Sequence, residues 1–326
     1  MNISQDQKIL DHIETTHGMN IVSSIAITKG INSSIYKLTD VNNNTFALKI
    51  YPKPSSKDPR KRFQHEMRFI EYMSHLSISN IPRVVSSSSS MQYCLFDWIN
   101  GKSIEAFKKQ HIAEIAKFII KLNTSKNLSL SQTLPKASEA IMSFQSMIDS
   151  ITYRIKSIED TEPNSEVGMQ VKRWIKEIIE PLIMVELRNF YSYKNEPAWN
   201  DCSIGHFVSP SDMGVHNVLS TSQGLYFIDF EYAGLDDMSK LIGDIVMQPN
   251  SPLDKTKEDV LIKELTARIP GDSSMWHARY LSIKPLVILK WILIMLRPYQ
   301  ENKIGLKRWS QIKAYAKRYS IQTEST

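Results

Sequence analysis

The stretch that decides the fold reads Ser209-Pro-Ser-Asp-Met-Gly-Val-His-Asn-Val-Leu219, and after a short polar turn it continues as Leu225-Tyr-Phe-Ile-Asp-Phe-Glu231. Pro210 and Gly214 keep the first part of this stretch from forming a regular helix. The two apolar runs flank a turn signature at residues 220–224, and this pattern predicts a β-hairpin.

Three oxygen-bearing side chains stand out in this stretch, namely Asp212, Asn217 and Asp229. The hairpin is expected to bring Asn217 and Asp229 side by side, with Asp212 one loop away. An amide oxygen beside a carboxylate suits Mg²⁺, which completes its shell with water and phosphate oxygens. A carboxylate that lies close to the metal but not on it accepts a proton from an incoming hydroxyl. The ordinary alternative is that Asp212 and Asn217 are turn residues or helix caps.

This pattern resembles the catalytic segment of the aminoglycoside phosphotransferase and choline kinase-like families, which share the protein-kinase fold. Their segment has an Asp, four further residues, an Asn, a hairpin, and then Asp-Phe-Glu or Asp-Trp-Glu. The resemblance implies that Asp212 is the catalytic base and that Asn217 and Asp229 hold Mg²⁺. One position departs from the families, because Pro210 stands where they usually have a histidine that supports the loop.

The N-terminal part predicts two strands joined by a small polar turn that contains Gly30 and Ser33. A glycine with small polar neighbours lets backbone N–H groups approach phosphate oxygens. The signal is weak by itself, since many hairpins carry Gly and Ser. The turn lacks both the three-glycine spacing of protein kinases and the Gly-Lys-Ser/Thr of a P-loop. Taken together with the resemblance, this turn predicts that Gly30 and Ser33 contact the nucleotide.

Lys49 lies on a predicted strand whose other residues are mainly apolar. A solvent-facing lysine on an edge strand is the ordinary alternative, but the resemblance implies a lysine that reaches the α- and β-phosphates of ATP. Residues 59–76 have helical periodicity, and Glu66 is adjacent to their apolar stripe. The resemblance implies that Glu66 is the acidic partner of Lys49. The alternatives on this helix are Glu71 and His65.

Two further strands, joined by a serine run, complete a five-stranded sheet with one helix. Residues 97–102 follow the last strand and resemble the hinge whose backbone binds adenine. The resemblance places Phe96 and Trp98 near the purine, although Trp98 equally suits the ordinary core.

The remainder of the chain predicts a mainly helical lobe. Ser103 is expected to cap its first helix, and Asp244 is expected to open a later helix and to cap or brace a loop. The segment 191–205 is aromatic and polar, and it either lies near the acceptor site or simply leads into the catalytic loop. Further helices are predicted over residues 137–158, 167–190, 256–268 and 275–318.

The charge, apolar segments and cysteines of the chain limit the classes of function to consider. The 326 residues carry a net charge of +6, which suits anionic ligands, but no zinc-finger, helix-turn-helix or aromatic RNA-reading signature is visible. The apolar residues 285–296 are too few for a membrane span and include Lys290, so they predict a buried helix. Cys94 and Cys202 have no metal-like spacing, and with no visible signal peptide they indicate a reducing cytoplasm. Oligomeric state stays open.

We therefore predict an α+β, two-lobed protein-kinase-like fold, with a small antiparallel-sheet N-lobe that contains one helix and a larger, mainly helical C-lobe. Residues 1–98 are expected to bind the nucleotide, and residues 99–326 to carry the catalytic loop and the acceptor site. The predicted activity is ATP- and Mg²⁺-dependent phosphorylation of a small-molecule hydroxyl, on a sugar, amino alcohol or aminoglycoside-like acceptor. The alternatives are a kinase-like nucleotide-binding protein without activity, motivated by Pro210, and transfer of AMP to a protein.

Overall fold

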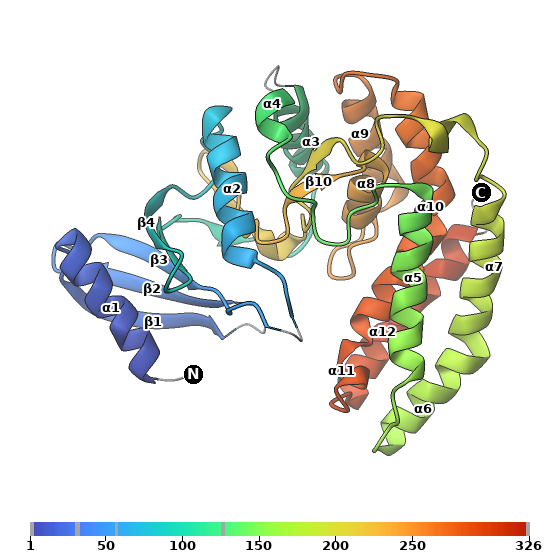
Figure 1. Cartoon of the computed structure of the whole chain (residues 1–326), viewed down its shortest axis with the longest axis horizontal. Helices are drawn as coiled ribbons and strands as arrows, with labels where there is room; N and C mark the ends of the chain where they lie inside the picture. The colour runs from blue at the N-terminus through green and yellow to red at the C-terminus, as the bar shows by residue number, and fades with distance from the viewer. Residues whose placement is uncertain (1–2, 30–32, 56–57, 125–127, 324–326) are drawn as a thin grey trace. The chain divides into compact units, whose positions relative to one another are not determined.

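The computed structural model describes residues 3–29, 33–55, 58–124 and 128–323. The chain forms two compact units (Figure 1). The first contains residues 1–104 together with residues 215–233, and the second contains residues 105–214 and 234–326. The first unit therefore includes a hairpin that comes from far along the sequence.

A five-stranded antiparallel sheet with the order β1-β2-β3-β5-β4 forms the centre of the first unit. It accounts for the predicted N-terminal strands, although the last two, predicted at residues 81–85 and 91–96, begin later. The strands are β1 (Ile21–Lys29), β2 (Ser34–Asp40), β3 (Thr45–Ile50), β4 (Val84–Ser88) and β5 (Tyr93–Asp97).

Helix α1 (Ile3–His17) covers one face of this sheet (Figure 1). Its residues Ile9 and Ile13 are fully buried against every second residue of the strands, including Leu38 and Leu48. Because successive strand residues point to opposite faces, the residues between them face the other way. That second face carries Lys49, and helix α2 (Arg62–His75) supplies its partner.

The predicted hairpin is present as β8 (Val218–Thr221) and β9 (Gly224–Phe227), with β6 (Lys102–Ser103) paired along the outer side of β8. The N–H of Ile228 donates to the carbonyl of Asn217 at 3.0 Å, which extends the pairing one step beyond the strands. The hairpin is anchored in the first unit, because the N–H of Phe227 donates to the carbonyl of Asn80 at 3.0 Å.

The second unit is mainly helical, and two short strands, β7 (Phe207–Ser209) and β10 (Gly234–Asp236), form a small antiparallel pair in it. A π-helical turn, η1 (Ile175–Ile179), joins two of its helices, and η2 (Pro197–Asn200) is a single 3₁₀ turn before β7. A second 3₁₀ turn, η3 (Val215–Asn217), follows β7 in the sequence and belongs to the first unit. The helices are α3 (Lys109–Thr124), α4 (Leu128–Ser131), α5 (Phe144–Glu159), α6 (Glu166–Trp174), α7 (Glu180–Tyr191), α8 (Met238–Val246), α9 (Lys255–Thr266), α10 (Ser273–Met295), α11 (Arg297–Gln300) and α12 (Leu306–Thr323).

Three sequence-based expectations about helix starts need correction. Ser103 belongs to β6 and does not cap α3, which starts six residues later. Helix α5 begins after Ser143, whose hydroxyl accepts the N–H of Ser146 in a capping box, so residues 137–143 are not helical. Asp237, not Asp244, caps the start of α8. At α5 and α8, local capping chemistry decides where the helix starts more strongly than apolar periodicity does.

Asp244 instead lies inside α8 and has a bracing role, which was the other part of the expectation. Its carboxylate is shared by Lys240 at 2.8 Å and Lys290 at 2.6 Å, and all three side chains are buried. This network ties α8 to α10, and the predicted buried helix at residues 285–296 is part of α10. In the described residues, no helix combines the length and the apolar character that a membrane crossing needs.

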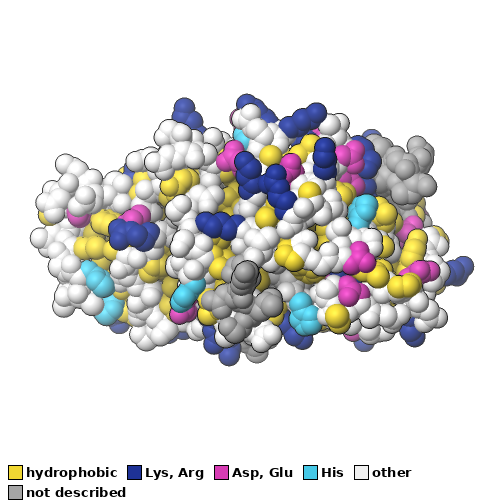
Figure 2. Space-filling model, turned by 90° about the horizontal axis from the view of Figure 1, so that it is seen from above, with side chains coloured by type: hydrophobic (Ala, Val, Ile, Leu, Met, Phe, Trp, Pro, Cys, Tyr) yellow, Lys and Arg dark blue, Asp and Glu magenta, His cyan; other side chains and the backbone are white. Residues whose placement is uncertain are grey.

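The basic charges are dispersed over the surface in view. Figure 2 shows Lys and Arg side chains at many separate places with Asp and Glu side chains between them, so on that face the net charge of +6 is not gathered into one patch.

Candidate nucleotide and metal site

A buried lysine surrounded by carboxylates is the main polar feature of the first unit. The Nζ atom of Lys49 lies 2.6 Å from Oε2 of Glu66, 2.6 Å from Oδ1 of Asp229 and 3.4 Å from Oε2 of Glu231. The Lys49 side chain is 5% exposed. The ordinary alternative of a solvent-facing lysine is therefore excluded, and three of the residues predicted to form the site lie together.

Strand alternation and register explain how Lys49 reaches this position. On β3, Phe46, Leu48 and Ile50 enter the core under α1, so Lys49 points to the opposite face. Helix α2 brings Glu66 to that face, whereas Glu71 of the same helix is exposed. Residue Asp229 arrives from the end of the β8–β9 hairpin.

Glu66 is held at both carboxylate oxygens. Its Oε2 accepts the ammonium of Lys49 and the hydroxyl of Tyr51, the latter at 2.9 Å, and its Oε1 accepts the N–H of Phe230 at 3.2 Å. The ring of Phe230 also packs against Phe69 of α2, with ring centroids 5.3 Å apart. Glu66 therefore fixes Lys49 and also the backbone directly after Asp229.

Electrostatics keep the lysine charged despite its burial. Burial alone lowers the pKa of Lys49, but the carboxylates of Asp229, Glu66 and Glu231 outweigh that effect and raise it above its ordinary value. Burial raises the pKa of Glu66, and the attraction of Lys49 opposes this shift. Burial also raises the pKa of Tyr51, with the neighbouring Glu66 acting in the same direction, so the tyrosine stays a hydrogen-bond donor.

A divalent metal fits the donor set around Asp229. The carboxylate atoms of Glu66, Asp229 and Glu231 lie within 4.8 Å of one another. The side chain of Asp229 is 33% exposed, whereas those of Glu66 and Glu231 are 2% exposed and engaged by Lys49. Asp229 is therefore the carboxylate of this cluster that can face a ligand, and the hairpin places Asn217 beside it through the bond between the Asn217 carbonyl and the backbone before Asp229.

The backbone at Asp229 is held in an uncommon conformation. Its φ is +66°, in the left-handed region that an aspartate tolerates but most residues avoid. Such conformations persist where the surrounding structure over-determines them, and they cluster at functional sites. The positive φ turns the chain sharply after β9, and Phe230 then reaches Glu66 while Asp229 reaches Lys49.

Glu231 was part of the recognised Asp-Phe-Glu pattern but was not among the predicted site residues. It accepts the hydroxyl of Ser33 at 2.7 Å, and its other oxygen lies 3.3 Å from Nε of Arg62. Arg62 is itself tied to Asp58 at 2.6 Å. Glu231 thus joins the turn after β1 to the start of α2. Ser33 therefore lies at the site, and Gly30 falls outside the described residues.

The face of the sheet that carries Lys49 also presents a row of side chains from neighbouring strands. Antiparallel pairing places Ile25 opposite Lys37, Lys37 opposite Ala47, and Ala47 opposite Phe96, and directly opposed residues share a face. Phe96 is buried, and Ile25 is 57% exposed. The ammonium of Lys37 lies 4.7 Å from the ring centroid of Trp98. The predicted purine contacts of Phe96 and Trp98 remain predictions.

The predicted catalytic base, Asp212, belongs to the second unit. Its Oδ1 accepts the N–H of Gly214 at 3.2 Å and the side-chain amide of Gln248 at 3.1 Å. Ser211 has a φ of +65°, and its N–H donates to the hydroxyl of Ser209 at 3.1 Å. Nothing in the local sequence pointed to Gln248, because it lies 36 residues beyond Asp212.

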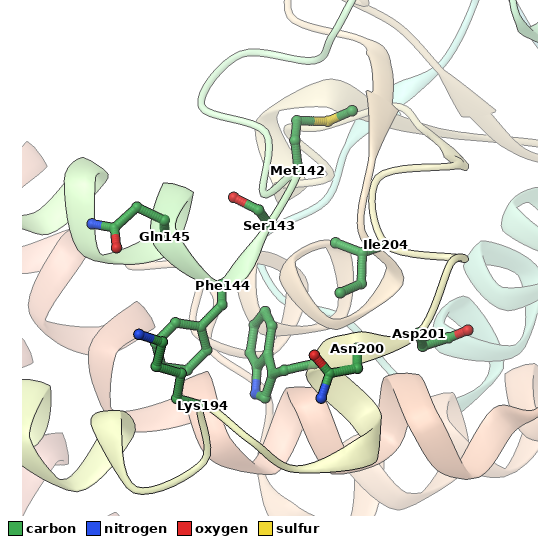
Figure 3. Close-up of a pocket in the computed structure, with 9 residues that line it drawn as sticks. Met142, Ser143, Phe144, Gln145, Lys194, Asn200, Asp201 and Ile204 are labelled. Atoms are coloured by element: carbon green, nitrogen blue, oxygen red, sulfur yellow. The ribbon is translucent and has the colours of Figure 1, made fainter.

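A pocket of about 450 Å³ lies elsewhere in the second unit (Figure 3). The Phe144 and Trp199 rings meet edge to face with centroids 5.3 Å apart, and Trp199 Nε1–H donates to the hydroxyl of Ser282 at 3.1 Å. Figure 3 shows Met142 and Ile204 on the side of the pocket opposite Lys194. The lining residues are Met142, Ser143, Phe144, Gln145, Lys194, Trp199, Asn200, Asp201 and Ile204.

A set of contacts links this pocket to helix α8, which leads to Gln248. Arg279 links Asp201, at the pocket, to Asp237 at the start of α8 with contacts of 3.1 and 2.8 Å. Gln248, which holds Asp212, follows the far end of the same helix. The expectation that residues 191–205 lie at the acceptor site stays a prediction.

Comparison with known proteins gave no match to a family model, and no curated protein matched the sequence. Solved structures do match. Spectinomycin phosphotransferase APH(9)-Ia, in complex with ADP and spectinomycin, is 14% identical, with 94% of this chain and 93% of that chain covered and a TM-score of 0.65. Choline kinase LicA from Streptococcus pneumoniae is 15% identical, with 97% and 99% covered and a TM-score of 0.62.

The chain has the fold of the small-molecule kinases. An ethanolamine kinase from Plasmodium vivax shares this kinase-like fold as well, at 13% identity, with 94% of this chain and 85% of that chain covered and a TM-score of 0.61. The predicted two-part composition, an antiparallel-sheet N-terminal region and a mainly helical C-terminal region, is confirmed. Identities this low establish the kinase-like fold and leave the activity to be argued from the residues.

Proposed function

We propose that this protein is an ATP- and Mg²⁺-dependent phosphotransferase that phosphorylates a hydroxyl group of a small molecule. The observation that carries the proposal is the buried Lys49, held by Glu66 and lying 2.6 Å from Asp229. Three residues from distant parts of the sequence converge there with the charges that a metal-nucleotide site needs. The kinase-like fold and the nucleotides present in its structural neighbours support the same function.

Lys49 would bind the α- and β-phosphates of ATP. Its ammonium has three donors, and Glu66 occupies one in a buried position. The contact with the partly exposed Asp229 is the one that phosphate oxygens would replace. Glu66 and Tyr51 keep the lysine in place during this exchange. Preorganised charge of this kind costs no rearrangement during the reaction and is a large part of phosphoryl-transfer catalysis.

Asp229 and Asn217 would hold Mg²⁺, which supplies positive charge against the phosphate oxygens. The cluster fits a dication, because the three carboxylates of Glu66, Asp229 and Glu231 outnumber the two cations Lys49 and Arg62. Glu231 would keep the turn at Ser33 over the phosphates. Asp212 would orient the acceptor hydroxyl and take up its proton.

For the acceptor, we propose a sugar or a sugar-like polyol. The structural neighbours by their names act on spectinomycin, choline and ethanolamine, so they favour no single class. The net charge of +6 disfavours a polycationic aminoglycoside. We place the reaction in the cytoplasm, in keeping with the two free cysteines, Cys94 and Cys202.

The second candidate is a kinase-like protein that binds nucleotide without transferring phosphate. The observation that favours it is Pro210, in the position of the usual loop histidine. A third candidate with the same fold transfers AMP to a protein.

Two measurements separate these candidates. Thermal unfolding with and without ATP and Mg²⁺ reports nucleotide binding, and ADP release over a panel of sugars, polyols, amino alcohols and antibiotics reports transfer. We expect stabilisation by MgATP and ADP release with one acceptor class, with the phosphorylated product identified by mass spectrometry. Binding without turnover on any acceptor would favour the inactive protein, and labelled AMP on a protein would favour the third candidate.

A further inference from the structure

The loop that carries Asp212 has an unusual support. The residue two positions before Asp212 is Pro210, which has no side-chain donor or acceptor and no backbone N–H. Within the loop, the hydroxyl of buried Ser209 accepts the N–H of Ser211 and shapes the turn. This contact orders the backbone and leaves the carboxylate of Asp212 to be oriented by other groups.

Gln248 reaches that carboxylate from outside the loop. Its Nε2 atom donates to Oδ1 of Asp212 at 3.1 Å, the oxygen that also accepts the N–H of Gly214. The Oε1 atom of Gln248 accepts the backbone N–H of Asn250 at 3.2 Å. Because one end of the amide accepts this bond, the other end, which carries the donors, faces Asp212. Gln248 is 4% exposed, so water does not compete freely for the bond.

The position of Gln248 is fixed by the structure around it. The hydroxyl of Tyr315 donates to the carbonyl of Met247 at 2.6 Å, and the N–H of Leu253 donates to the carbonyl of Val246 at 2.9 Å. The N–H of Ser251 donates to the Gln248 carbonyl itself at 3.2 Å. These bonds anchor the backbone on both sides of Gln248, so the amide is a rigid donor and not a mobile surface group.

We propose that Gln248 is a positioning residue for the carboxylate of Asp212, the proposed catalytic base. The inference rests on the proposed function, since it assigns Asp212 its role as the base. A neutral amide restrains the rotation of the carboxylate without adding charge beside it. Hydrogen bonds to a charged acceptor are among the stronger ones in proteins, so the loss of this bond lets the base leave its productive orientation.

The test compares Gln248→Leu, which keeps the approximate volume but cannot donate, with the parent protein. We expect kcat for acceptor phosphorylation to fall roughly 10–100-fold, as for a lost bond to a charged group, with the KM for ATP unchanged within a factor of about two. Gln300→Leu is the matched control, because it removes another glutamine amide in the same unit, one that donates to Ser157 at 2.8 Å. Its kcat should equal that of the parent.

A double-mutant cycle with Asp212→Asn separates positioning from general loss of structure. If Gln248 acts through Asp212, Gln248→Leu should lower the residual rate of Asp212→Asn by less than about twofold, because the group it positions is already gone. An equal loss of rate in both backgrounds, or a parental kcat for Gln248→Leu, would overturn the proposal. A crystal structure of Gln248→Leu supplies a readout without turnover, with a rotated Asp212 carboxylate expected and an unmoved one contradicting the inference.

The failure of the proposed function has a different signature. In that case the parent protein releases no ADP with any acceptor, and this outcome removes the positioning role as well. The crystallographic comparison would then still report whether Gln248 orients the Asp212 side chain.

Discussion

Replacing Glu66 by glutamine tests the centre of the proposed nucleotide site, because it changes only one carboxylate oxygen into an NH₂ group. Glu66 accepts three hydrogen bonds, from Lys49, Tyr51 and the N–H of Phe230. Glutamine has one acceptor oxygen and one donor NH₂ group in the same space. Whichever way the amide turns, its NH₂ group faces another donor, either the ammonium of Lys49 or the N–H of Phe230.

The loss of stability in Glu66→Gln depends on which partners Lys49 keeps. Removing one partner of a buried ion pair costs about 3–5 kcal/mol when the survivor is left uncompensated. Lys49 keeps Asp229 at 2.6 Å and Glu231 at 3.4 Å, so we place the cost lower, at about 2–3 kcal/mol, in the upper part of the range for hydrogen bonds to charged groups. Because Glu66 also holds the backbone after Asp229, the affinity for MgATP should fall about tenfold or more.

Hydrogen exchange measured by mass spectrometry suits this prediction, because it reports the opening of β3 and α2 separately from the second unit. The free energy of opening in these segments should fall by about 2–3 kcal/mol in Glu66→Gln, and calorimetry should show the weaker nucleotide binding. Glu71→Gln is the control on the same helix, where the exposed side chain predicts a change within about 0.5 kcal/mol. Equal protection and equal MgATP affinity in Glu66→Gln and the parent would refute the reasoning.

The other predictions concern the second unit. Asp212→Asn should keep the affinity for ATP and lose roughly 10²–10⁴-fold in kcat, as expected for removal of a general base; an unchanged kcat would show that the role is wrong. Burial lowers the pKa of Lys290 from 10.5 to about 8. Between those values the unfolded chain binds more protons than the folded one, so this lysine makes stability rise with pH. Lys290→Met should flatten that rise in urea melts at about pH 7.5 and 9.5, and an identical pH dependence would count against it. A Cβ added at Gly234 would lie 2.1 Å from the carbonyl oxygen of Pro135. Gly234→Ala should therefore destabilise by about 3 kcal/mol or more, seen in thermal unfolding, whereas Gly305→Ala, with nothing within 4 Å, should not.

The resemblance to the kinase-like families predicted the fold and the roles of Lys49 and Asp229 at one site, and local sequence signals explain part of that arrangement. The hairpin has clear turn chemistry, and the alternation on β3 forces Lys49 away from the core under α1. The choice of Glu66 over Glu71 agrees with the geometry, since Glu66 lies on the buried side of α2.

The contact of Gln248 with Asp212, across 36 residues, could not be predicted from local sequence patterns. Gln248 meets Asp212 where the segment after α8 is anchored by other contacts, and nothing in the local sequence marks this glutamine. The start of α5 was also placed too early, because the capping by Ser143 outweighs the apolar pattern of the preceding residues. The contact between Gln248 and Asp212 arises from tertiary structure and is not encoded locally, whereas the Ser143 cap is a local signal that the apolar pattern concealed.

The most direct test of the central claim is calorimetric titration of ATP into the parent protein and into Asp229→Asn, each with and without Mg²⁺. If Asp229 holds the metal against the nucleotide, Mg²⁺ should strengthen ATP binding in the parent by tenfold or more, taking about 1.4 kcal/mol per tenfold. In Asp229→Asn this strengthening should largely disappear. Equal strengthening by Mg²⁺ in both proteins would contradict the assignment of the metal-nucleotide site.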